Sequence, residues 1–209
     1  MKTLAIIGSG HLGQQIAHYA ISDNHYSKVV FFDDFTTENK ISGFEVLGNS
    51  NDVEKSFSEG LFEELLIGIG YKHLEIRKEL FGRFENKIPF GRIIHSSSWV
   101  DETAVVLPGC VIYPNCCIDA HAKIGKNSIL NISCTIAHDT EVGSNCFLSP
   151  RVAIAGFVNV GECSILGINS TLIDNIKIVA NTQVGGGTVV IGSLESSGLY
   201  VGNPARFIR

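Results

Sequence analysis

The chain has 209 residues and a formal net charge of −5, with 44% hydrophobic and 18% charged residues. An acidic balance without a basic block argues against a nucleic-acid-binding surface. No run approaches the 18 apolar residues of a membrane helix and no signal peptide opens the chain, so we expect a cytoplasmic protein that binds neither membrane nor nucleic acid.

The first predicted elements are a strand, a glycine-rich turn and a helix. Residues 4–7 are apolar, Gly8-Ser9-Gly10-His11-Leu12-Gly13 follows, and residues 14–20 have helical apolar spacing. Glycines at such a turn allow a phosphate to reach backbone N–H groups at the helix N-terminus. The turn therefore predicts a nucleotide site, while close packing of strand on helix is an alternative reason for the same glycines.

The next apolar run, residues 29–32, ends in Asp33 and Asp34. In a dinucleotide fold, an acidic residue about 20 positions after the glycine turn binds a ribose hydroxyl. A complete dinucleotide fold needs two βαβαβ halves, and only one half fits before the repeat that begins near residue 100. We therefore predict a Rossmann-like half domain over residues 1–98 that holds one nucleotide or the diphosphate of a nucleotide sugar.

Two further elements complete this half domain. Residues 65–69 predict a buried strand closed by Gly68-Ile69-Gly70, and residues 72–84 predict a helix. Residues 92–95 then form an apolar run that leads into the second domain, which we place at residues 99–209.

The second domain is defined by a six-residue repeat. Between residues 100 and 190 every sixth residue is Ile, Leu or Val, at sixteen positions without exception, and the fourth residue after each is usually small. Gly, Asn and Asp gather between these positions, as turn residues do. A fixed period of this kind predicts a β-solenoid of hexapeptides, with three hexads in each triangular coil of about 18 residues and a cap over residues 192–209.

Four of the six cysteines occupy the small inward position of this repeat, namely Cys110, Cys116, Cys134 and Cys146. A free thiol packs there as a small apolar side chain. The adjacent pair Cys116 and Cys117 lacks a metal-ligand spacing, and a cytosolic location argues against disulfides. We therefore expect packing rather than bridges or metal ligation.

The repeat contains two histidines, and one of them, His138, is followed directly by Asp139. A neighbouring carboxylate holds an imidazole in one tautomer and increases its basicity, as a general base requires. One coil later, Gly156 is expected to stack over His138, to leave room for an acyl group and to offer a backbone N–H to a developing oxyanion. The alternative is a solvated His-Asp pair at a polar corner with no chemical role.

Together these features resemble the bacterial nucleotide-sugar acetyltransferases with hexapeptide repeats, a family that includes UDP-4-amino-sugar N-acetyltransferases and sialic acid O-acetyltransferases. The resemblance covers essentially the whole chain. It rests on the repeat and on these motifs: Gly8-Ser9-Gly10-His11, Phe32-Asp33-Asp34-Phe35, Ile67-Gly68-Ile69-Gly70, Glu75-Ile76-Arg77, His138-Asp139, Leu166-Gly167-Ile168-Asn169-Ser170 and Val201-Gly202-Asn203-Pro204-Ala205-Arg206.

The resemblance implies an α/β Rossmann-like half domain followed by a left-handed parallel β-helix. It also implies a homotrimer whose active sites lie between neighbouring β-helices, with acetyl-coenzyme A in that groove beside Gly156 and Gly186 and no metal. The implied reaction is acetyl transfer to the amino group of a nucleotide-linked amino-deoxysugar, such as a UDP-4-amino-4,6-dideoxy sugar, in bacterial glycan biosynthesis.

Residue roles also follow from the resemblance. His138 would deprotonate the acceptor amine with help from Asp139, the Gly156 N–H would bind the thioester oxygen, and Asn131 aligns with an asparagine near the reactive centre. The sugar nucleotide would contact Gly8, Gly10, His11, Asp33, Asp34 and Gly70. One position departs from the family, which often has a second histidine nine residues after the base. Here that residue is Phe147, so the size or placement of the acyl group is expected to differ.

Three other functions stay open on the sequence. O-acetylation of a sialic acid or related sugar would use the same base, since nothing in His138 separates an amine from a hydroxyl acceptor. A metal hydratase of the carbonic anhydrase type would need three histidines around zinc, whereas the repeat has two and the residue one coil after His121 is Asp139. A non-catalytic scaffold or nucleotide sensor would need only the solenoid and its N-terminal domain.

Overall fold

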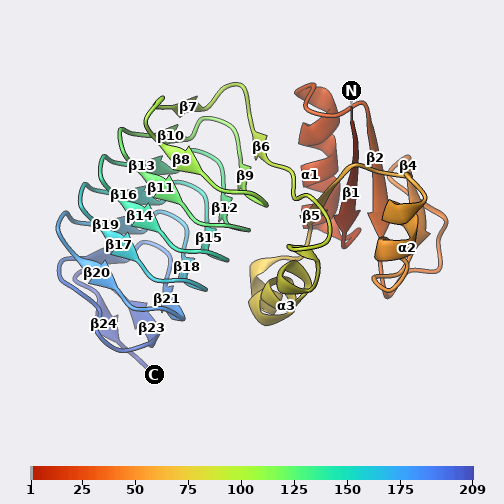
Figure 1. The fold of residues 1–209 in the computed structure, drawn as a ribbon. Helices are drawn as coiled ribbons and strands as arrows, with labels where there is room; N and C mark the ends of the chain where they lie inside the picture. The colour runs from red at the N-terminus through yellow and green to blue at the C-terminus, as the bar shows by residue number, and fades with distance from the viewer. Residues whose placement is uncertain (1) are drawn as a thin grey trace. The chain divides into compact units, whose positions relative to one another are not determined.

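The computed structural model describes residues 2–209, and the chain divides into two compact units at Ile93 and Ile94 (Figure 1). The sequence analysis places this boundary after residue 98. The second unit begins earlier because β6 (Ile93–Ile94) already belongs to the same sheet as β9 (Val111–Ile112), and the His95 N–H donates to the Ile112 carbonyl at 3.0 Å.

The N-terminal unit is built on a five-stranded sheet with the strand order β3-β4-β2-β1-β5. Its strands are β1 (Thr3–Ile7), β2 (Lys28–Phe32), β3 (Lys40–Ile41), β4 (Phe44–Gly48) and β5 (Glu64–Ile67). The central strand β1 pairs in parallel with β2 on one side and with β5 on the other, and all three are apolar and largely buried. Continuous apolar runs of this kind are typical of parallel strands covered on both faces. The antiparallel pairing of β3 with β4 was not predicted, because a two-residue strand shows no periodicity.

The helices of this unit are α1 (His11–Ser22), α2 (Val53–Ser58) and α3 (Leu74–Phe84), and a 3₁₀ turn, η1 (Tyr71–His73), precedes α3. The turn between β1 and α1 requires glycine for steric reasons. A Cβ on Gly13 would lie 1.9 Å from the Gly8 carbonyl oxygen, and Gly8 itself has φ +98°. Close packing, the alternative reason for glycine in this turn, is therefore present at Gly8 and Gly13, whereas a Cβ on Gly10 would meet nothing within 4 Å.

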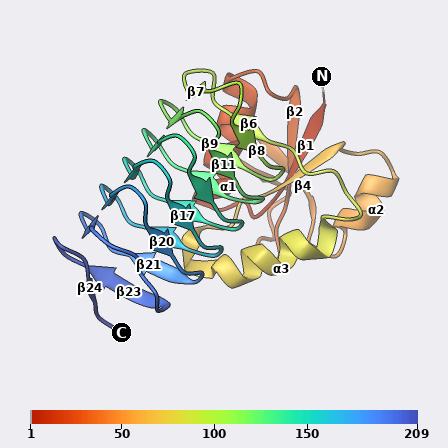
Figure 2. The ribbon, with the colours of Figure 1, turned by 60° about the vertical axis from the view of Figure 1, so that its left-hand side comes forward.

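The second unit is a β-helix whose coils stack along one axis (Figures 1 and 2). We call its three sheets the first, second and third faces. The first face contains β6, β9, β12 (Ile129–Leu130), β15 (Phe147–Leu148), β18 (Ile165–Leu166), β21 (Thr182–Val184), β23 (Gly198–Val201) and β24 (Arg206–Phe207). The second contains β7 (Trp99–Val100), β10 (Cys117–Ile118), β13 (Thr135–Ile136), β16 (Ala153–Ile154), β19 (Thr171–Leu172) and β22 (Val189–Val190). The third contains β8 (Val105–Val106), β11 (Lys123–Ile124), β14 (Glu141–Val142), β17 (Asn159–Val160) and β20 (Lys177–Ile178).

From β7 to β22, neighbouring strands of each face pair in parallel at the 18-residue offset that the hexads predict, as Ile136 pairs with Ile154. Each coil turns at residues in the left-handed backbone region. Fourteen consecutive corner residues, six apart, have positive φ: Gly109, Asn115, His121, Asn127, Ser133, Asp139, Asn145, Arg151, Phe157, Cys163, Asn169, Asn175, Asn181 and Gly187. Gly and Asn enter this region most easily, which explains why they gather between the aliphatic positions.

The repeated aliphatic residues point inward and form one continuous core. The series starts one hexad earlier than predicted, because Ile94 already packs against this core. The series also ends differently. Leu194, the fourth residue after Val190, is expected to stack on Ile176, 18 residues earlier. It instead forms a bridge to Ile178, 16 residues earlier, because the last coil is two residues shorter. The strand β23 then pairs in parallel with β21, and β24 pairs antiparallel with β23, so both strands extend the first face beyond β21.

The four cysteines at small inward positions are buried and free. Burial raises the pKa of the Cys146 thiol to about 12, which keeps it protonated. Its Sγ lies 3.4 Å from the Gly161 carbonyl oxygen, in the geometry of a weak hydrogen bond. These thiols therefore pack as the sequence analysis expects of small core side chains.

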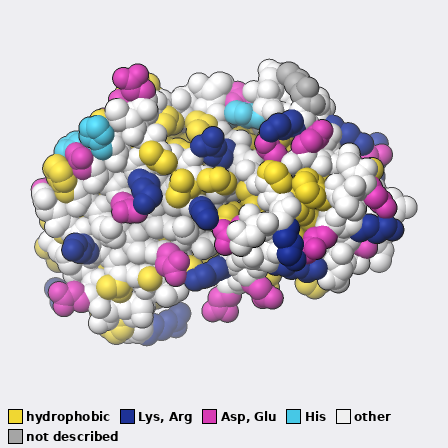
Figure 3. Space-filling view, viewed as in Figure 1, with side chains coloured by type: hydrophobic (Ala, Val, Ile, Leu, Met, Phe, Trp, Pro, Cys, Tyr) yellow, Lys and Arg dark blue, Asp and Glu magenta, His cyan; other side chains and the backbone are white. Residues whose placement is uncertain are grey.

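Within residues 2–209, no helix combines the length and hydropathy that crossing a bilayer would require. On the face of the molecule drawn in Figure 3, acidic and basic side chains are interspersed rather than segregated.

Candidate active site

A cavity of about 630 Å³ opens in the N-terminal unit. Its lining includes all six residues that the sequence analysis assigns to the sugar nucleotide, namely Gly8, Gly10, His11, Asp33, Asp34 and Gly70. They meet because β1, β2 and β5 are parallel neighbours, so the loops after their carboxyl ends share one edge of the sheet. Ligands of open α/β sheets bind at this edge.

Close contact between two of these loops shapes the cavity floor. A Cβ on Gly68 would lie 2.8 Å from the Gly8 carbonyl oxygen and from the Cα of Gly13. Below the loop, the buried Arg77 of α3 donates hydrogen bonds to the carbonyls of Ile67 and Ile69. In the sequence, Arg77 was named only as part of a motif. The signal for its structural role was its spacing of three and four residues from the apolar Leu80 and Phe81, which places it on the buried face of α3.

Asp33 supports the glycine turn and has little capacity left for a ligand. One carboxylate oxygen accepts hydrogen bonds from the Ser9 N–H at 2.7 Å and the Ser9 hydroxyl at 2.6 Å, and the other accepts from the Phe35 N–H at 2.9 Å. Desolvation is the largest influence on the Asp33 pKa and raises it, but the hydrogen bonds from Ser9, Phe35 and Thr36 together outweigh desolvation and hold the pKa below its usual range. The expected ribose contact therefore suits Asp34 better, because among the described residues only its Oδ1 is engaged, by the Ser50 N–H at 2.6 Å.

The cavity lining also contains residues to which the sequence analysis gave no role in binding. η1 contributes Tyr71, Lys72 and His73, while Phe35 and Ile76 add exposed apolar surface. Phe35 is 95% exposed. A cationic Lys72 and the N–H groups of the glycine turn suit a diphosphate, and the apolar side chains of the lining suit a planar base or sugar. The three polar residues directly after Gly70 were the available signal in the sequence.

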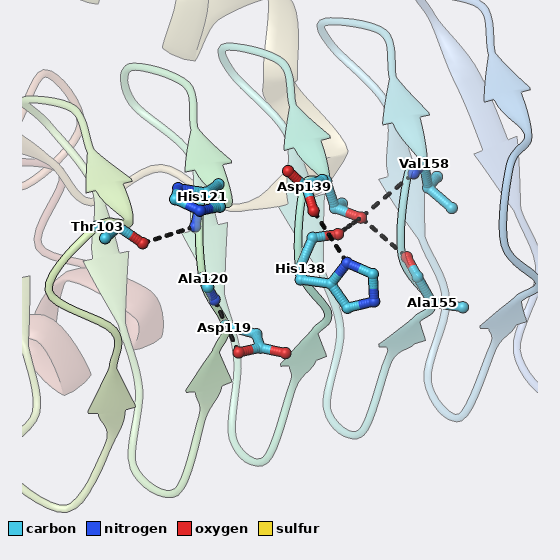
Figure 4. Close-up of polar contacts among 9 residues, drawn as sticks. Thr103, Asp119, Ala120, His121, His138, Asp139, Ala155 and Val158 are labelled. Carbon is cyan, nitrogen blue, oxygen red and sulfur yellow. Dashed lines mark hydrogen bonds and ion pairs between the residues drawn. The ribbon is translucent and has the colours of Figure 1, made fainter.

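In the β-helix, His138 and Asp139 lie at the corner between β13 and β14 (Figure 4). The His138 Nδ1 lies 3.0 Å from the Asp139 Oδ2, and the two side chains are 49% and 39% exposed. A hydrogen on Nδ1 completes this bond and leaves the Nε2 lone pair available. Since Nε2 has no partner among the described residues, it can accept a proton from a bound molecule.

Gly156 lies one coil beyond His138, as predicted, but the space that it leaves is occupied differently. A Cβ on Gly156 would lie 2.7 Å from the His138 Cε1 and 2.9 Å from Nε2, so the imidazole itself lies against the glycine. The expectation of empty room for an acyl group is therefore revised. The Gly156 N–H has no acceptor among the described residues, so it remains available to an oxyanion.

Two further contacts join this corner to the next coil. The Thr140 hydroxyl donates to the Ala155 carbonyl at 2.8 Å and accepts from the Val158 N–H at 3.3 Å. The ring of Phe157 meets the His138 imidazole edge-on, with centroids 5.1 Å apart and planes at 86°. The sequence analysis did not single out Phe157.

The other predicted residues of the β-helix do not join His138 within one chain. Asn131 and Gly186 both follow strands of the first face, so they lie at the corner between the first and second faces, three coils apart. His138 lies at the corner between the second and third faces. Phe147 is buried in β15 on the first face, away from the corner that holds His138.

The second histidine of the repeat, His121, lies one coil before Asp139, and its N–H donates to the Thr103 hydroxyl at 2.9 Å (Figure 4). Among residues 2–209, no group of three or more His, Cys, Asp or Glu side chains has an arrangement that could hold a metal ion. The three-histidine site of a zinc hydratase is thus not formed by these residues.

Family models match both units. Residues 3–84 match the PglD N-terminal domain, and residues 121–156 match the bacterial transferase hexapeptide model of six repeats. These matches lie on the two segments that the sequence analysis assigned to the half domain and to the hexapeptide repeat.

Several solved structures are similar over nearly the full length. The acetyltransferase domain of PglB from Neisseria gonorrhoeae FA1090 has a TM-score of 0.92 at 24% identity, with 100% of both chains covered. A variant of perosamine N-acetyltransferase from Caulobacter crescentus, solved with CoA and GDP-perosamine, has a TM-score of 0.92 at 27% identity, with 99% of this chain and 97% of that chain covered. WeeI from Acinetobacter baumannii AYE has a TM-score of 0.85 at 22% identity, with 99% of both chains covered. The predicted fold, an α/β half domain followed by a left-handed β-helix of hexapeptides, is confirmed.

Proposed function

Because this chain belongs to the PglD-like family of hexapeptide-repeat acyltransferases, we propose that it transfers an acetyl group from acetyl-coenzyme A to the amino group of a nucleotide-linked amino-deoxysugar. The observation that carries the proposal is the His138–Asp139 pair, whose free Nε2 lies against a glycine with an unengaged N–H. The related perosamine N-acetyltransferase, solved with CoA and GDP-perosamine, supports both the donor and the acceptor class.

The chemistry follows from this corner. Asp139 holds Nδ1–H of His138, so Nε2 removes a proton from the amine as its nitrogen attacks the thioester carbon. The carbonyl oxygen becomes an oxyanion and accepts a hydrogen bond from the Gly156 N–H. Collapse of the tetrahedral intermediate forms the amide and releases coenzyme A as the thiolate, which receives the proton from the imidazolium. The step needs neither a metal nor a covalent enzyme intermediate.

The cavity of the N-terminal unit is the proposed holder of the acceptor. We assign the diphosphate to the glycine turn and Lys72, a ribose hydroxyl to Asp34, and the base to the apolar side chains of the lining, Phe35 and Ile76. The cavity volume of about 630 Å³ falls within the usual range for small-molecule sites. Among nucleotide sugars, we propose a 4-amino-4,6-dideoxy sugar, with UDP as the first nucleotide to test.

We further propose a homotrimer. Gly186, assigned to acetyl-coenzyme A, and Asn131, assigned to the reactive centre, lie at a corner of the β-helix that His138 and Gly156 do not share. They can line one site with His138 only if this corner of one copy meets the other corner of the next copy. A ring of three such head-to-tail contacts closes around a threefold axis.

Product analysis tests the proposed function. The purified chain is incubated with acetyl-coenzyme A and, separately, UDP- and GDP-linked 4-amino sugars, sialic acid, or no acceptor, and the products are identified by mass spectrometry. We expect coenzyme A release and a monoacetylated amino sugar nucleotide. A product acetylated on a hydroxyl would replace the N-acetyl proposal with O-acetylation, and the absence of acceptor-dependent coenzyme A release would reject both.

A further inference from the structure

A few corner residues of the β-helix, Arg151, Phe157 and Cys163 among them, have side chains that the left-handed backbone region does not favour. Among the fourteen consecutive corners with positive φ, six are Asn and two are Gly. Phe157 adopts φ +59° at such a corner. A bulky side chain is strained in this region, whereas Asn enters it readily. Asn at this position would therefore suit the fold better than Phe.

The core does not explain this residue either. Phe157 is 55% exposed, so its ring is outside the inward-pointing aliphatic series. Its ring instead contacts the imidazole of His138 edge-on, at a centroid distance of 5.1 Å. The Phe157 N–H also donates to the His138 carbonyl at 3.2 Å, which ties the two residues together at the backbone.

The imidazole is held from three sides. Asp139 accepts from Nδ1 at 3.0 Å, Gly156 lies so close that a Cβ there would clash with the ring, and Phe157 meets the ring at a right angle. A single hydrogen bond at Nδ1 leaves a half-exposed ring free to swing about its side-chain torsions. A bulky wall beside it removes the alternative orientations.

We propose that Phe157 is a positioning residue that holds the His138 imidazole with Nε2 directed toward the acceptor amine. The inference rests on the proposed function of His138 as general base. It explains why a strained corner is retained, since local backbone strain is often kept at functional sites where it serves pre-organisation. It also predicts a trade-off between stability and turnover at position 157, because Asn would stabilise the corner whereas Phe would favour the reaction.

The first test is Phe157→Asn. Loss of the ring is expected to lower kcat by about 10- to 100-fold, the range in which small misplacements of a reacting group act, while KM for either substrate changes less than about twofold. Relief of the strained corner is expected to raise the melting temperature by about 2–4 °C. Phe157→Tyr keeps the ring at this exposed position and should retain kcat to within about threefold.

Cys163→Asn is the matched control. Cys163 occupies the next corner, also at positive φ, one coil beyond Asn145, which already accepts a hydrogen bond from the Asn127 amide at 2.8 Å. This variant should raise the melting temperature to a similar extent with an unchanged kcat. A fall in kcat in Cys163→Asn equal to that in Phe157→Asn would overturn the inference, because corner chemistry and not the ring would then set the rate.

A structural readout keeps the inference testable without an identified acceptor. In crystals of Phe157→Asn, the His138 imidazole is expected to occupy a second orientation away from Gly156. A single unchanged orientation, or an unchanged kcat in Phe157→Asn alongside an inactive His138→Ala, would overturn the inference and leave the proposed function intact. Full turnover by His138→Ala would instead reject the general base and, with it, the role of Phe157.

Discussion

The two units of this chain assemble their candidate sites in different ways. In the N-terminal unit, the cavity joins loops that follow β1, β2 and β5, which are far apart in sequence and meet because parallel strands end at one edge. In the β-helix, the candidate catalytic residues lie on one corner, where Gly156 stacks on His138 at an offset of one coil. The order of strands in the sheet brings the residues of the first site together, whereas the 18-residue period of the coils brings those of the second together.

This difference predicts a division of labour. A binding site in one unit and a proton acceptor in the other should separate in kinetics, since the loss of a substrate contact made equally in ground and transition states raises KM, whereas the loss of a group used only in the reaction lowers kcat. Substitutions in the β-helix corner are therefore expected to change kcat, and substitutions in the cavity to change KM. A substitution in the corner that changes KM instead, or one in the cavity that changes kcat instead, would contradict this division of labour.

The largest expected effect is that of His138→Ala. Without the base, kcat should fall by about two to four decades, because general base catalysis typically contributes that much. The side chain is half-exposed and outside the core, so the melting temperature and the oligomeric state should stay unchanged. Steady-state coenzyme A release measures kcat, a thermal melt measures the melting temperature, and light scattering measures the oligomeric state. A variant with a rate within about threefold of the parent would contradict the assignment of His138 as the base.

Gly156→Ala is expected to have the next largest effect. The new Cβ would lie 2.7 Å from the His138 Cε1, so the imidazole must move and kcat should fall by about 10- to 100-fold. Gly192→Ala is the control within the same unit, since a Cβ there meets nothing within 4 Å. Equal losses in the two variants would mean that glycine flexibility, rather than contact with the imidazole, is the cause.

The hexad period makes the β-helix corner predictable from the order of residues alone. Counting 18 residues from His138 leads to Gly156 whatever the hand of the helix, and the same count places Thr103, His121 and Asp139 in one column. The count gave the wrong partner for Leu194, because the last coil is two residues shorter than the others. The sequence does not reveal this change, since Leu194 is opposite an apolar residue at an offset of either 16 or 18 residues. Phe157 was not predicted either. Its proposed role depends on a ring contact between coils and on its φ angle, and the six-residue period predicts neither.

The cavity was predicted less completely, for a topological reason. Strand ends identified Gly8, Asp33 and Gly70, because each follows an apolar run. The hydrogen bonds from Ser9 to Asp33 depend on which strands are neighbours in the sheet, and a single sequence does not specify that order. The sequence therefore named Asp33 as a ligand contact, although in the folded chain its carboxylate holds the glycine turn.

Lys72→Ala tests the cavity side of the comparison. Loss of the cation at the wall formed by η1 should raise KM for the nucleotide sugar by about 3- to 10-fold, as expected for one charge-assisted contact to a phosphate, with little change in kcat. Lys55→Ala is the matched control, because Lys55 belongs to an exposed pair with Glu59 on α2 and does not line the cavity. A fall in kcat without a change in KM would show that Lys72 acts in the reaction rather than in binding.

The smallest expected effect concerns acid stability and Asp33. Hydrogen bonds from Ser9 and Phe35 outweigh desolvation and lower the Asp33 pKa in the folded chain, so its stabilising contribution is fully present above the ordinary value of 3.8 and is lost as the pH falls through the lowered value. Asp33→Asn lacks this titration. Its free energy of unfolding should be lower than that of the parent near neutral pH, and the difference should shrink as the pH is lowered from about 5 toward about 2. Denaturant melts across this range measure the difference, and a gap that stays constant with pH would show that the carboxylate charge is not what holds the glycine turn.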